Sequence, residues 1–159
     1  MAKSDLDAFD RRLLTLVQHD ASRTADSLAE EVGLSPSAVL RRLKRLRDDG
    51  VILATIAVVD PRKAGKPNFF LAALEIERER PEMIARLRQW LAAEEWIQQV
   101  YYVTGTADFI LVVVAPDVGA YDTLMSRLMV DNPNVRRFTT NVALGVGKRS
   151  LFVPVDPAD

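Results

Sequence analysis

Cysteine is absent from the 159-residue chain, and histidine occurs only once, at His19. Without cysteine the protein can form no disulfide and has no thiolate chemistry, which is compatible with a reducing compartment. A single histidine excludes a histidine-based metal cluster, and its position beside Asp20 is typical of an exposed helix end. We expect no cofactor, no metal site and no catalytic residue.

Long apolar runs are also missing: no stretch is long enough to span a bilayer, and the N-terminus has no signal-peptide pattern. The net charge is only -1, although 27% of the residues are charged. This balance argues against a uniformly basic coat for nucleic acid, so any DNA contact must come from a local patch. We expect a cytoplasmic protein with no membrane partner.

A helix-turn-helix pattern occupies residues 29–47. Ala29 is small where two helices would touch, and Gly33 suits the positive φ that follows a helix. Ser35 and Pro36 then provide an N-cap and a first-turn proline for a second helix. The apolar residues of that helix share one face at helical spacing, namely Val39, Leu43 and Leu46.

The other face of the second helix is cationic, with small residues near its start. Five basic residues lie between Arg41 and Arg47 with no acid among them. Such a helix suits the DNA major groove, although a solvated basic helix in an ordinary bundle is the alternative. The candidate DNA-binding residues are Ser35, Ser37, Ala38, Arg41, Arg42 and Arg45.

Two further helices complete the expected N-terminal unit, one after an Asp7 N-cap and one after a Thr24 N-cap. The β-branched run Val51 to Val59 predicts a strand that acts as a wing or an exit strand. Residues 60–68 concentrate proline, glycine and charge, which is typical of a linker. We predict a DNA-binding domain over residues 1–62 and a second domain over residues 63–159.

The second domain alternates strand and helix patterns in a twofold repeat, which predicts a ferredoxin-like βαββαβ sheet and an α+β fold class overall. Lys148–Val155 is a candidate extra edge strand. The predicted elements are strands over 69–77, 96–104, 109–115 and 135–144, and helices over 81–91 and from Asp117 onward.

Residues 109–114 would supply apolar side chains to both faces of this sheet, whereas the helices cover only one face. A second copy of the sheet is the simplest cover for the other face, because a large apolar patch marks an interaction surface. We therefore expect a homodimer, whose two recognition helices could address two half-sites in double-stranded DNA.

Several segments in order along the chain resemble the Lrp/AsnC (feast/famine) family of bacterial and archaeal transcription regulators. These segments are LDAFDRRLL at residues 6–14, VGLSPSAVLRRLKRL at 32–46, the Asp49–Ile52 helix exit, and VTGTADFILVV at 103–113. The last segment carries the family's GxxD loop at Gly105 and Asp108.

The resemblance implies a winged helix-turn-helix joined to an effector-binding domain of the type called RAM, which dimerises through its sheet and often assembles into a homo-octamer. It also implies an amino acid or related small-molecule effector bound between subunits near the GxxD loop. The implied effector-binding residues are Tyr102, Thr104, Gly105, Thr106, Ala107 and Asp108, joined by Thr140, Asn141 and Val142. Gly105 would free backbone N–H groups for a carboxylate, and Asp108 would receive an ammonium or orient the loop.

Three other interpretations stay open. A GxxD pattern alone also forms an ordinary β-turn between strands. A nucleoid-organising protein that wraps DNA without effector control would share the same two domains and differ by a weak specificity ratio. Sirohaem decarboxylases resemble this architecture too, but they rely on histidine and arginine, and the single His19 argues against an enzyme.

Overall fold

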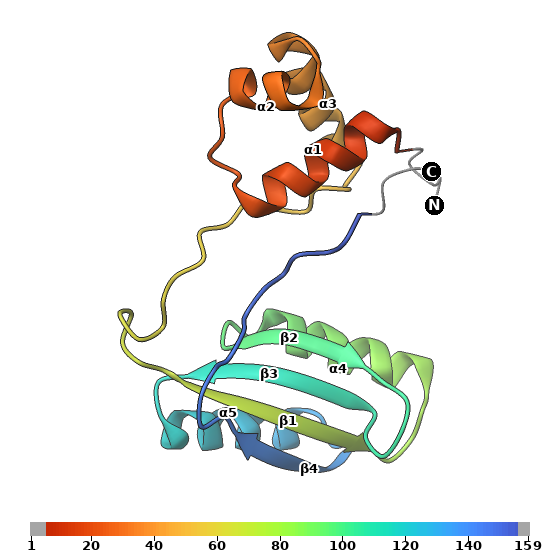
Figure 1. Ribbon diagram of the computed structural model, residues 1–159. Coiled ribbons are helices and arrows are strands. Elements are labelled where there is room, and N and C mark those ends of the chain that lie inside the picture. The colour runs from red at the N-terminus through yellow and green to blue at the C-terminus, as the bar shows by residue number, and fades with distance from the viewer. Residues whose placement is uncertain (1–5, 156–159) are drawn as a thin grey trace. The chain divides into compact units, whose positions relative to one another are not determined.

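The computed structural model describes residues 6–155. The chain divides into two compact units, which among the described residues are 6–58 with 148–155 and 59–147 (Figure 1). The predicted domain boundary at residue 62 lies close to the boundary at residue 58. The return of the chain to the first unit at residue 148 was not predicted. Each unit is described by itself below.

The first unit contains α1 (Ala8–His19), α2 (Ala25–Val32) and α3 (Pro36–Asp48). Each helix begins at a predicted cap: Asp7, Thr24 and Ser35 accept a hydrogen bond from the backbone three residues on. Gly33 takes φ 74° after α2, as expected for a helix end. The three helices enclose a core of Leu13, Leu14, Leu28, Ala29, Val32, Val39, Leu43 and Leu46.

The predicted strand Val51–Val59 is wrong, because the structure has no strand between α3 and residue 68. The β-branched residues there are well suited to a strand, but a strand needs a neighbour for its backbone hydrogen bonds. No segment of the described chain pairs with them. Large apolar side chains in this stretch stay exposed, including Leu53, Ile56 and Val58.

The predicted edge strand Lys148–Val155 is also wrong, because this segment has no strand structure and belongs to the first unit. The Gln18 side chain holds it on α1 by donating to the Val153 carbonyl at 3.0 Å and accepting from the Val153 N–H at 2.8 Å. The Phe152 ring stacks on His19 with centroids 4.8 Å apart, and Val155 packs against the helical core. Contacts to α1 thus replace pairing with the sheet.

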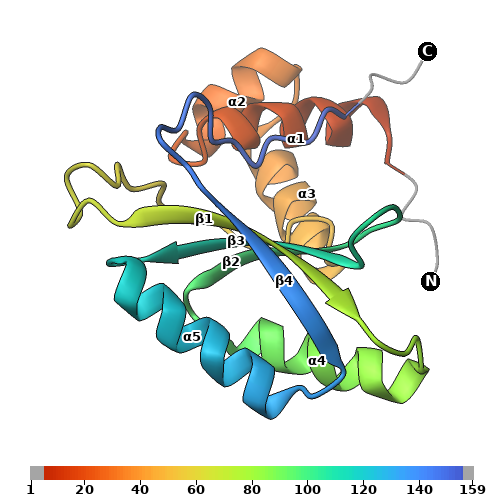
Figure 2. The same cartoon turned by 90° about the horizontal axis from the view of Figure 1, so that it is seen from below.

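The second unit has the predicted ferredoxin-like order: β1 (Asn68–Ile76), α4 (Pro81–Ala93), β2 (Ile97–Tyr102), β3 (Phe109–Ala115), α5 (Val118–Asp131) and β4 (Val135–Val142). The four strands form one antiparallel sheet in the order β2-β3-β1-β4. Both helices lie on the same side of the sheet (Figure 2). The other side of the sheet is therefore left without helices.

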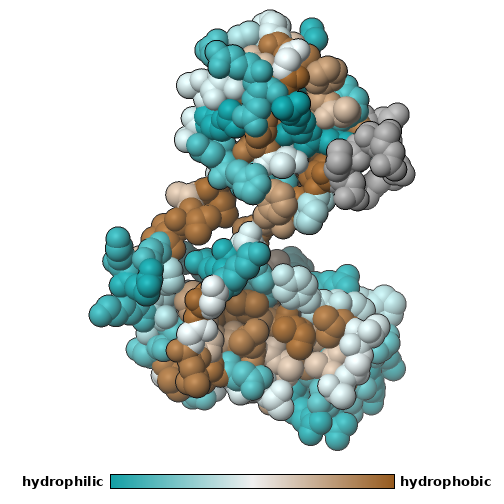
Figure 3. All heavy atoms as spheres, in the orientation of Figure 1, coloured by the Kyte–Doolittle hydropathy of each residue, from teal (hydrophilic) through white to brown (hydrophobic). Residues whose placement is uncertain are grey.

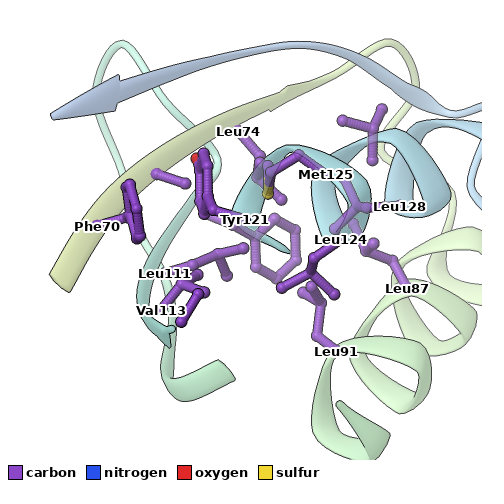
Figure 4. Packing of buried hydrophobic residues seen from close by; sticks show 14 residues of the cluster. Phe70, Leu74, Leu87, Leu91, Leu111, Val113, Tyr121, Leu124, Met125 and Leu128 are labelled. Carbon is purple, nitrogen blue, oxygen red and sulfur yellow. The ribbon is translucent and has the colours of Figure 1, made fainter. Parts of the chain in front are cut away.

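The core of this unit lies between the sheet and the two helices (Figure 4). Alternate residues of β3 from Phe109 to Ala115 are fully buried, as the period of two in a strand requires. Tyr121 of α5 stacks on Phe70 with ring centroids 4.0 Å apart, and its hydroxyl bonds to the Thr140 hydroxyl at 2.5 Å. The helices are thereby fixed to one face of the sheet.

The remaining residues of the central strands point to the open face of the sheet. They are Phe69, Leu71 and Ala73 from β1, with Ile110, Val112 and Val114 from β3. Figure 3 shows hydrophobic residues gathered over these strands. Glu75 and Arg137 form an ion pair of 2.6 Å at the side of this surface. The centre of the surface is therefore apolar, and this part of its border is charged.

Candidate DNA-binding helix and candidate effector loop

Three arginines of α3 line a cavity of about 180 Å³, namely Arg41, Arg42 and Arg45. Arg41 and Arg45 are exposed, and Arg42 is half-buried. The opposite face packs Val39, Leu43 and Leu46 into the core. Arg41 is exposed and has no ion-pair partner among residues 6–155. A guanidinium in this position is available for a phosphate or a guanine edge.

Arg42 is tied down inside the first unit. Its Nη1 donates to Asp7 Oδ2 at 2.7 Å and to Asp10 Oδ1 at 2.9 Å, and its guanidinium lies 5.4 Å from the centre of the Phe9 ring. Only 22% of the side chain is exposed. Arg42 therefore links α3 to the start of α1, and most of its surface is withdrawn from solvent.

Arg45 and Lys44 are paired as well. Arg45 Nη2 donates to Asp10 Oδ2, and Lys44 bonds to Asp48 at 2.5 Å on the exposed side of the helix. The sequence pattern of five basic residues without an intervening acid missed the pairs of Arg42 and Arg45, because their partners Asp7 and Asp10 lie at the start of another helix. Asp7 and Asp10 did carry a signal as the cap and first-turn acid of α1, but that signal concerned helix formation only.

Hydrogen bonds at this site shift the pKa values of Asp7 and Arg42. A hydrogen bond from the Asp10 backbone N–H is the main cause that lowers the pKa of Asp7, and Arg42 adds to it. The pKa of Arg42 is raised, mainly by its hydrogen bond to the Asp7 carboxylate. Both groups are therefore charged throughout the physiological range.

The small residues at the start of α3 lie where the sequence predicted them. Ser35 accepts the Ala38 N–H at 3.3 Å as the N-cap, and its hydroxyl lies 3.1 Å from that of Ser37. Ser35 and Ser37 are exposed, and Ala38 is half-buried. Their size leaves the first turn of the helix open to close approach by a backbone or base edge.

The candidate effector loop connects β2 to β3. Thr104, Gly105 and Thr106 are exposed, and Ala107 and Asp108 are half-buried. Gly105 takes φ 122°, a backbone conformation that side chains with a Cβ rarely adopt. The loop is therefore a sharp turn whose tip is open to solvent.

Asp108 is anchored to the neighbouring strand. Its Oδ2 accepts the Ile76 N–H at 2.7 Å, its own N–H donates to the Leu74 carbonyl at 2.8 Å, and its carbonyl accepts the Val103 N–H at 2.9 Å. These bonds lie beside the irregularity in pairing at Glu75 and Ile76. The carboxylate thus holds the end of β1 and orients the loop.

The other predicted effector residues do not meet this loop within one chain. Thr140, Asn141 and Val142 pair with Ala72, Leu71 and Phe70 of β1, whereas the loop begins beside Leu74, at the other end of that strand. Their strand β4 and the loop-bearing strand β2 also form opposite edges of the sheet.

Tyr102 lies on the helix side of the sheet. Its ring is 4.9 Å from that of Phe109 and lies under the Arg88 guanidinium at 5.0 Å, and it remains partly exposed. Tyr102 thus reaches the beginning of the loop through its backbone rather than through its side chain.

A helix-turn-helix unit with an exposed basic helix, joined to a ferredoxin-like unit with an open apolar sheet face, is the architecture of a two-domain DNA-binding regulator. Two family models match the chain: winged helix-turn-helix DNA-binding over residues 6–52 and the Lrp/AsnC ligand binding domain over residues 70–151. The chain belongs to the Lrp/AsnC family of transcriptional regulators. It is a DNA-binding regulator and not an enzyme.

Individual relatives match this chain over nearly its full length. The chain is 38% identical to the HTH-type transcriptional regulator y4tD of Sinorhizobium fredii, covering 96% of this chain and 90% of that one. The crystal structure of an AsnC family regulator from Agrobacterium tumefaciens matches with a TM-score of 0.84 at 27% identity, covering 94% and 97% of the two chains. The NMB0573 regulator of Neisseria meningitidis, solved as an L-Met complex, has the same fold with a TM-score of 0.82 at 23% identity, covering 95% and 97%.

No helix within the described residues is long and apolar enough to cross a membrane. Among the same residues, no three histidine or acidic side chains gather in a way that could hold a metal ion.

Proposed function

We propose that α3 reads operator DNA and that an amino acid bound at the Thr104–Asp108 loop, at an interface between two copies of the chain, controls that reading. The observation that best supports effector binding is the exposed turn around Gly105, which lies beside an open apolar sheet face. The relative solved with L-Met makes an amino acid the ligand class to test first.

The DNA part rests on the exposed face of α3. Small hydroxyl residues occupy its first turn, and Arg41 follows with a free guanidinium among the described residues. This order allows close approach of the helix and then a charged contact with a phosphate or a base edge. Ser35, Ser37, Ala38, Arg41, Arg42 and Arg45 remain the proposed DNA-facing residues, with Arg42 and Arg45 restrained by their acidic partners.

The effector part rests on the turn itself. The backbone bends sharply at Gly105, and N–H groups freed by such a bend would suit the carboxylate of an amino acid. The Asp108 carboxylate is already bonded to Ile76, so its contribution is to orient the loop as well as to add negative charge. Because Thr140, Asn141 and Val142 lie away from the loop in one chain, they can join the site only from a second copy.

The dimer part rests on the open sheet face. Its central residues are apolar, and burying such a surface against a second copy stabilises an assembly in proportion to the area removed from water. A twofold pair of identical sheets is the simplest closed arrangement, and larger assemblies such as an octamer would add contacts elsewhere.

The test is a thermal-shift screen of the full chain against the proteinogenic amino acids. A ligand at a hundredfold its Kd stabilises the folded state by about 2.7 kcal/mol, which raises Tm measurably. Thr106→Arg, at the exposed loop tip, should abolish the shift. Thr123→Arg, at an exposed position on α5, is the matched control and should keep it. A flat response to every amino acid, or a shift that survives Thr106→Arg, would contradict the effector site.

A nucleoid-organising role without effector control is the alternative. Pairing of Arg42, Lys44 and Arg45 with acids reduces the charge that α3 offers to phosphates, which weighs against binding by charge alone. Selection of duplexes from a randomised pool distinguishes the two roles. Recovery of a defined motif supports a sequence-specific regulator, and recovery of unrelated sequences supports the alternative.

A further inference from the structure

Asp10 is the only charged residue that is fully buried in the described part of the chain. A carboxylate without access to water is unfavourable unless it is paired and hydrogen-bonded. Here both oxygens are satisfied: Oδ1 accepts from Arg42, and Oδ2 accepts from Arg45 and from the Asp7 N–H at 3.3 Å. The pairing partners are two arginines of the candidate recognition helix.

The two arginines lie one turn apart on α3, at positions i and i+3, so a single carboxylate on α1 can hold both. Asp7 adds a second acid to Arg42, and the Phe9 ring lies against the same guanidinium. Arg45 differs from Arg42, because 46% of its side chain remains exposed despite the pair. The acid therefore fixes where both guanidinium groups are presented while leaving Arg45 partly available.

We propose that Asp10 is a positioning residue for DNA recognition, one that holds Arg42 and Arg45 in place and offsets their charge so that α3 discriminates between sequences. This inference rests on the proposed reading of DNA by α3. Free arginines bind phosphates of any sequence, and each phosphate contact raises affinity equally for correct and incorrect sites. Arginines already neutralised by a buried acid contribute less to that common affinity, which leaves more of the discrimination to base-edge contacts by residues such as Arg41 and Ser37.

Asp10 also closes the capping box of α1 by accepting the Asp7 N–H, but a capping box does not require two arginines of another helix. A buried ion pair is weak support for a fold, because well-packed apolar residues of similar volume serve as well or better. The first unit has an apolar core of eight residues beside Asp10. Placing the acid beneath two arginines of α3, rather than elsewhere in this core, ties its effect to the surface that faces DNA.

The experiment measures binding of the full chain to two duplexes over a range of salt concentrations. One duplex is the tightest sequence that the wild-type protein selects from a randomised pool, and the other has a scrambled sequence. Asp10→Asn keeps the side-chain shape and an acceptor but removes the charge. It should raise affinity for the scrambled duplex, make the slope of log K against log salt steeper by about one to two, and lower the specificity ratio roughly tenfold.

Glu30→Gln is the matched control, since Glu30 is an exposed acid of α2 that makes no ion pair among the described residues. It makes the same change in net charge and should leave the slope and the ratio close to wild type. Equal changes in Asp10→Asn and Glu30→Gln would overturn the inference, because net charge would then explain both. A loss of affinity for both duplexes without a steeper slope would also overturn it, because that is the result of a purely structural role.

Arg41→Ala separates this inference from the function on which it rests. If Arg41→Ala binds both duplexes as tightly as wild type, α3 does not read DNA, and the proposed function fails. If Arg41→Ala weakens binding but Asp10→Asn leaves slope and ratio unchanged, only the role of Asp10 fails. Should Asp10→Asn not fold, Asp7→Asn releases one of the two acids on Arg42 at an exposed position. It should shift the slope and the ratio in the same direction by a smaller amount, and no shift would count against the inference.

Discussion

Asp108 has a structural role that can be separated from its charge, because its carboxylate oxygen accepts a backbone N–H at the end of β1. Asp108→Ala leaves the half-buried Ile76 N–H without this acceptor, which costs about 1–3 kcal/mol. Asp108→Asn keeps an acceptor and should cost less than half as much. Urea unfolding of both variants measures the difference, and equal destabilisation would show that the hydrogen bond to Ile76 is not what Asp108 contributes.

Asp108→Asn also isolates the charge in effector binding. If the carboxylate meets an ammonium, the asparagine variant should lose most of the ligand-induced thermal shift while its own Tm stays near wild type. If it keeps the full shift, the residue only orients the loop, and the backbone around Gly105 makes the contacts with the ligand.

Asp7 gives the first unit a dependence on acid pH. Its pKa is lowered in the folded state, so its contribution to stability is fully present above the unfolded pKa of about 3.9 and is lost as pH falls through the folded value. Asp7→Asn keeps the N-cap, since asparagine caps as well as aspartate. The variant should therefore lose less stability than wild type between pH 5 and pH 2 (roughly the interval in which such a carboxylate is protonated). Thermal unfolding across this range, with Glu30→Gln as control, measures it; parallel curves for wild type and Asp7→Asn would contradict it.

At the scale of helices and strands, the sequence best predicted the features that depend on residues close together in the chain. Asp7, Thr24, Ser35 and Asp117 all cap the helices expected to follow them, because a cap needs only a neighbour three residues away. The strand Phe109–Ala115 was predicted to the residue from its continuous apolar run. The segments 51–59 and 148–155 were predicted wrongly as strands, because pairing depends on partners far along the chain that composition does not reveal.

The same limit applies to the candidate site. The GxxD pattern located the β2–β3 turn, since glycine and aspartate are typical of such turns. It did not reveal that the Asp108 carboxylate is bonded to Ile76, or that Thr140 is bonded to Tyr121 on the helix side of the sheet. On α3, helical periodicity placed the arginines correctly but could not show that acids of α1 neutralise two of them.

Contacts between the C-terminal segment, residues 148–155, and α1 should contribute to the stability of the first unit. Gln18 makes two hydrogen bonds to Val153, and Phe152 stacks on His19. The double variant Gln18→Ala with Phe152→Ala should lower the stability of this unit by about 1–3 kcal/mol, because it removes two hydrogen bonds and one ring contact. Hydrogen exchange of the α1 amides reads the change locally.

Arg12→Ala with Leu144→Ala is a control for that variant, since Arg12 is an exposed residue of α1 and Leu144 is fully exposed, so neither change removes a contact with residues 148–155. The prediction fails if α1 exchanges at the same rate in wild type and in the Gln18 and Phe152 double variant.

At the scale of the whole molecule, assembly is the property that the open sheet face should control. Leu71 and Val112 are paired residues of neighbouring strands in the centre of that face. Leu71 is 42% exposed in the single chain. Covering such side chains with a second sheet removes them from water, whereas a lysine there would place an unpaired charge in the interface. If the proposed dimer forms through this face, Val112→Lys should convert it to a monomer, with a rise in dissociation constant of at least a hundredfold.

Val130→Lys is the matched control, because Val130 is a 79% exposed valine on α5, on the opposite side of the same sheet. Analytical ultracentrifugation of wild type and both variants decides the matter. A monomer for Val112→Lys and a dimer for Val130→Lys would assign the dimer interface to the open face. The reverse result would place the interface on the helices. If the effector site needs Asn141 from a second copy, Val112→Lys should lose the ligand-induced thermal shift as it dissociates, and a monomer that still responds to the ligand would confine the effector site to one chain.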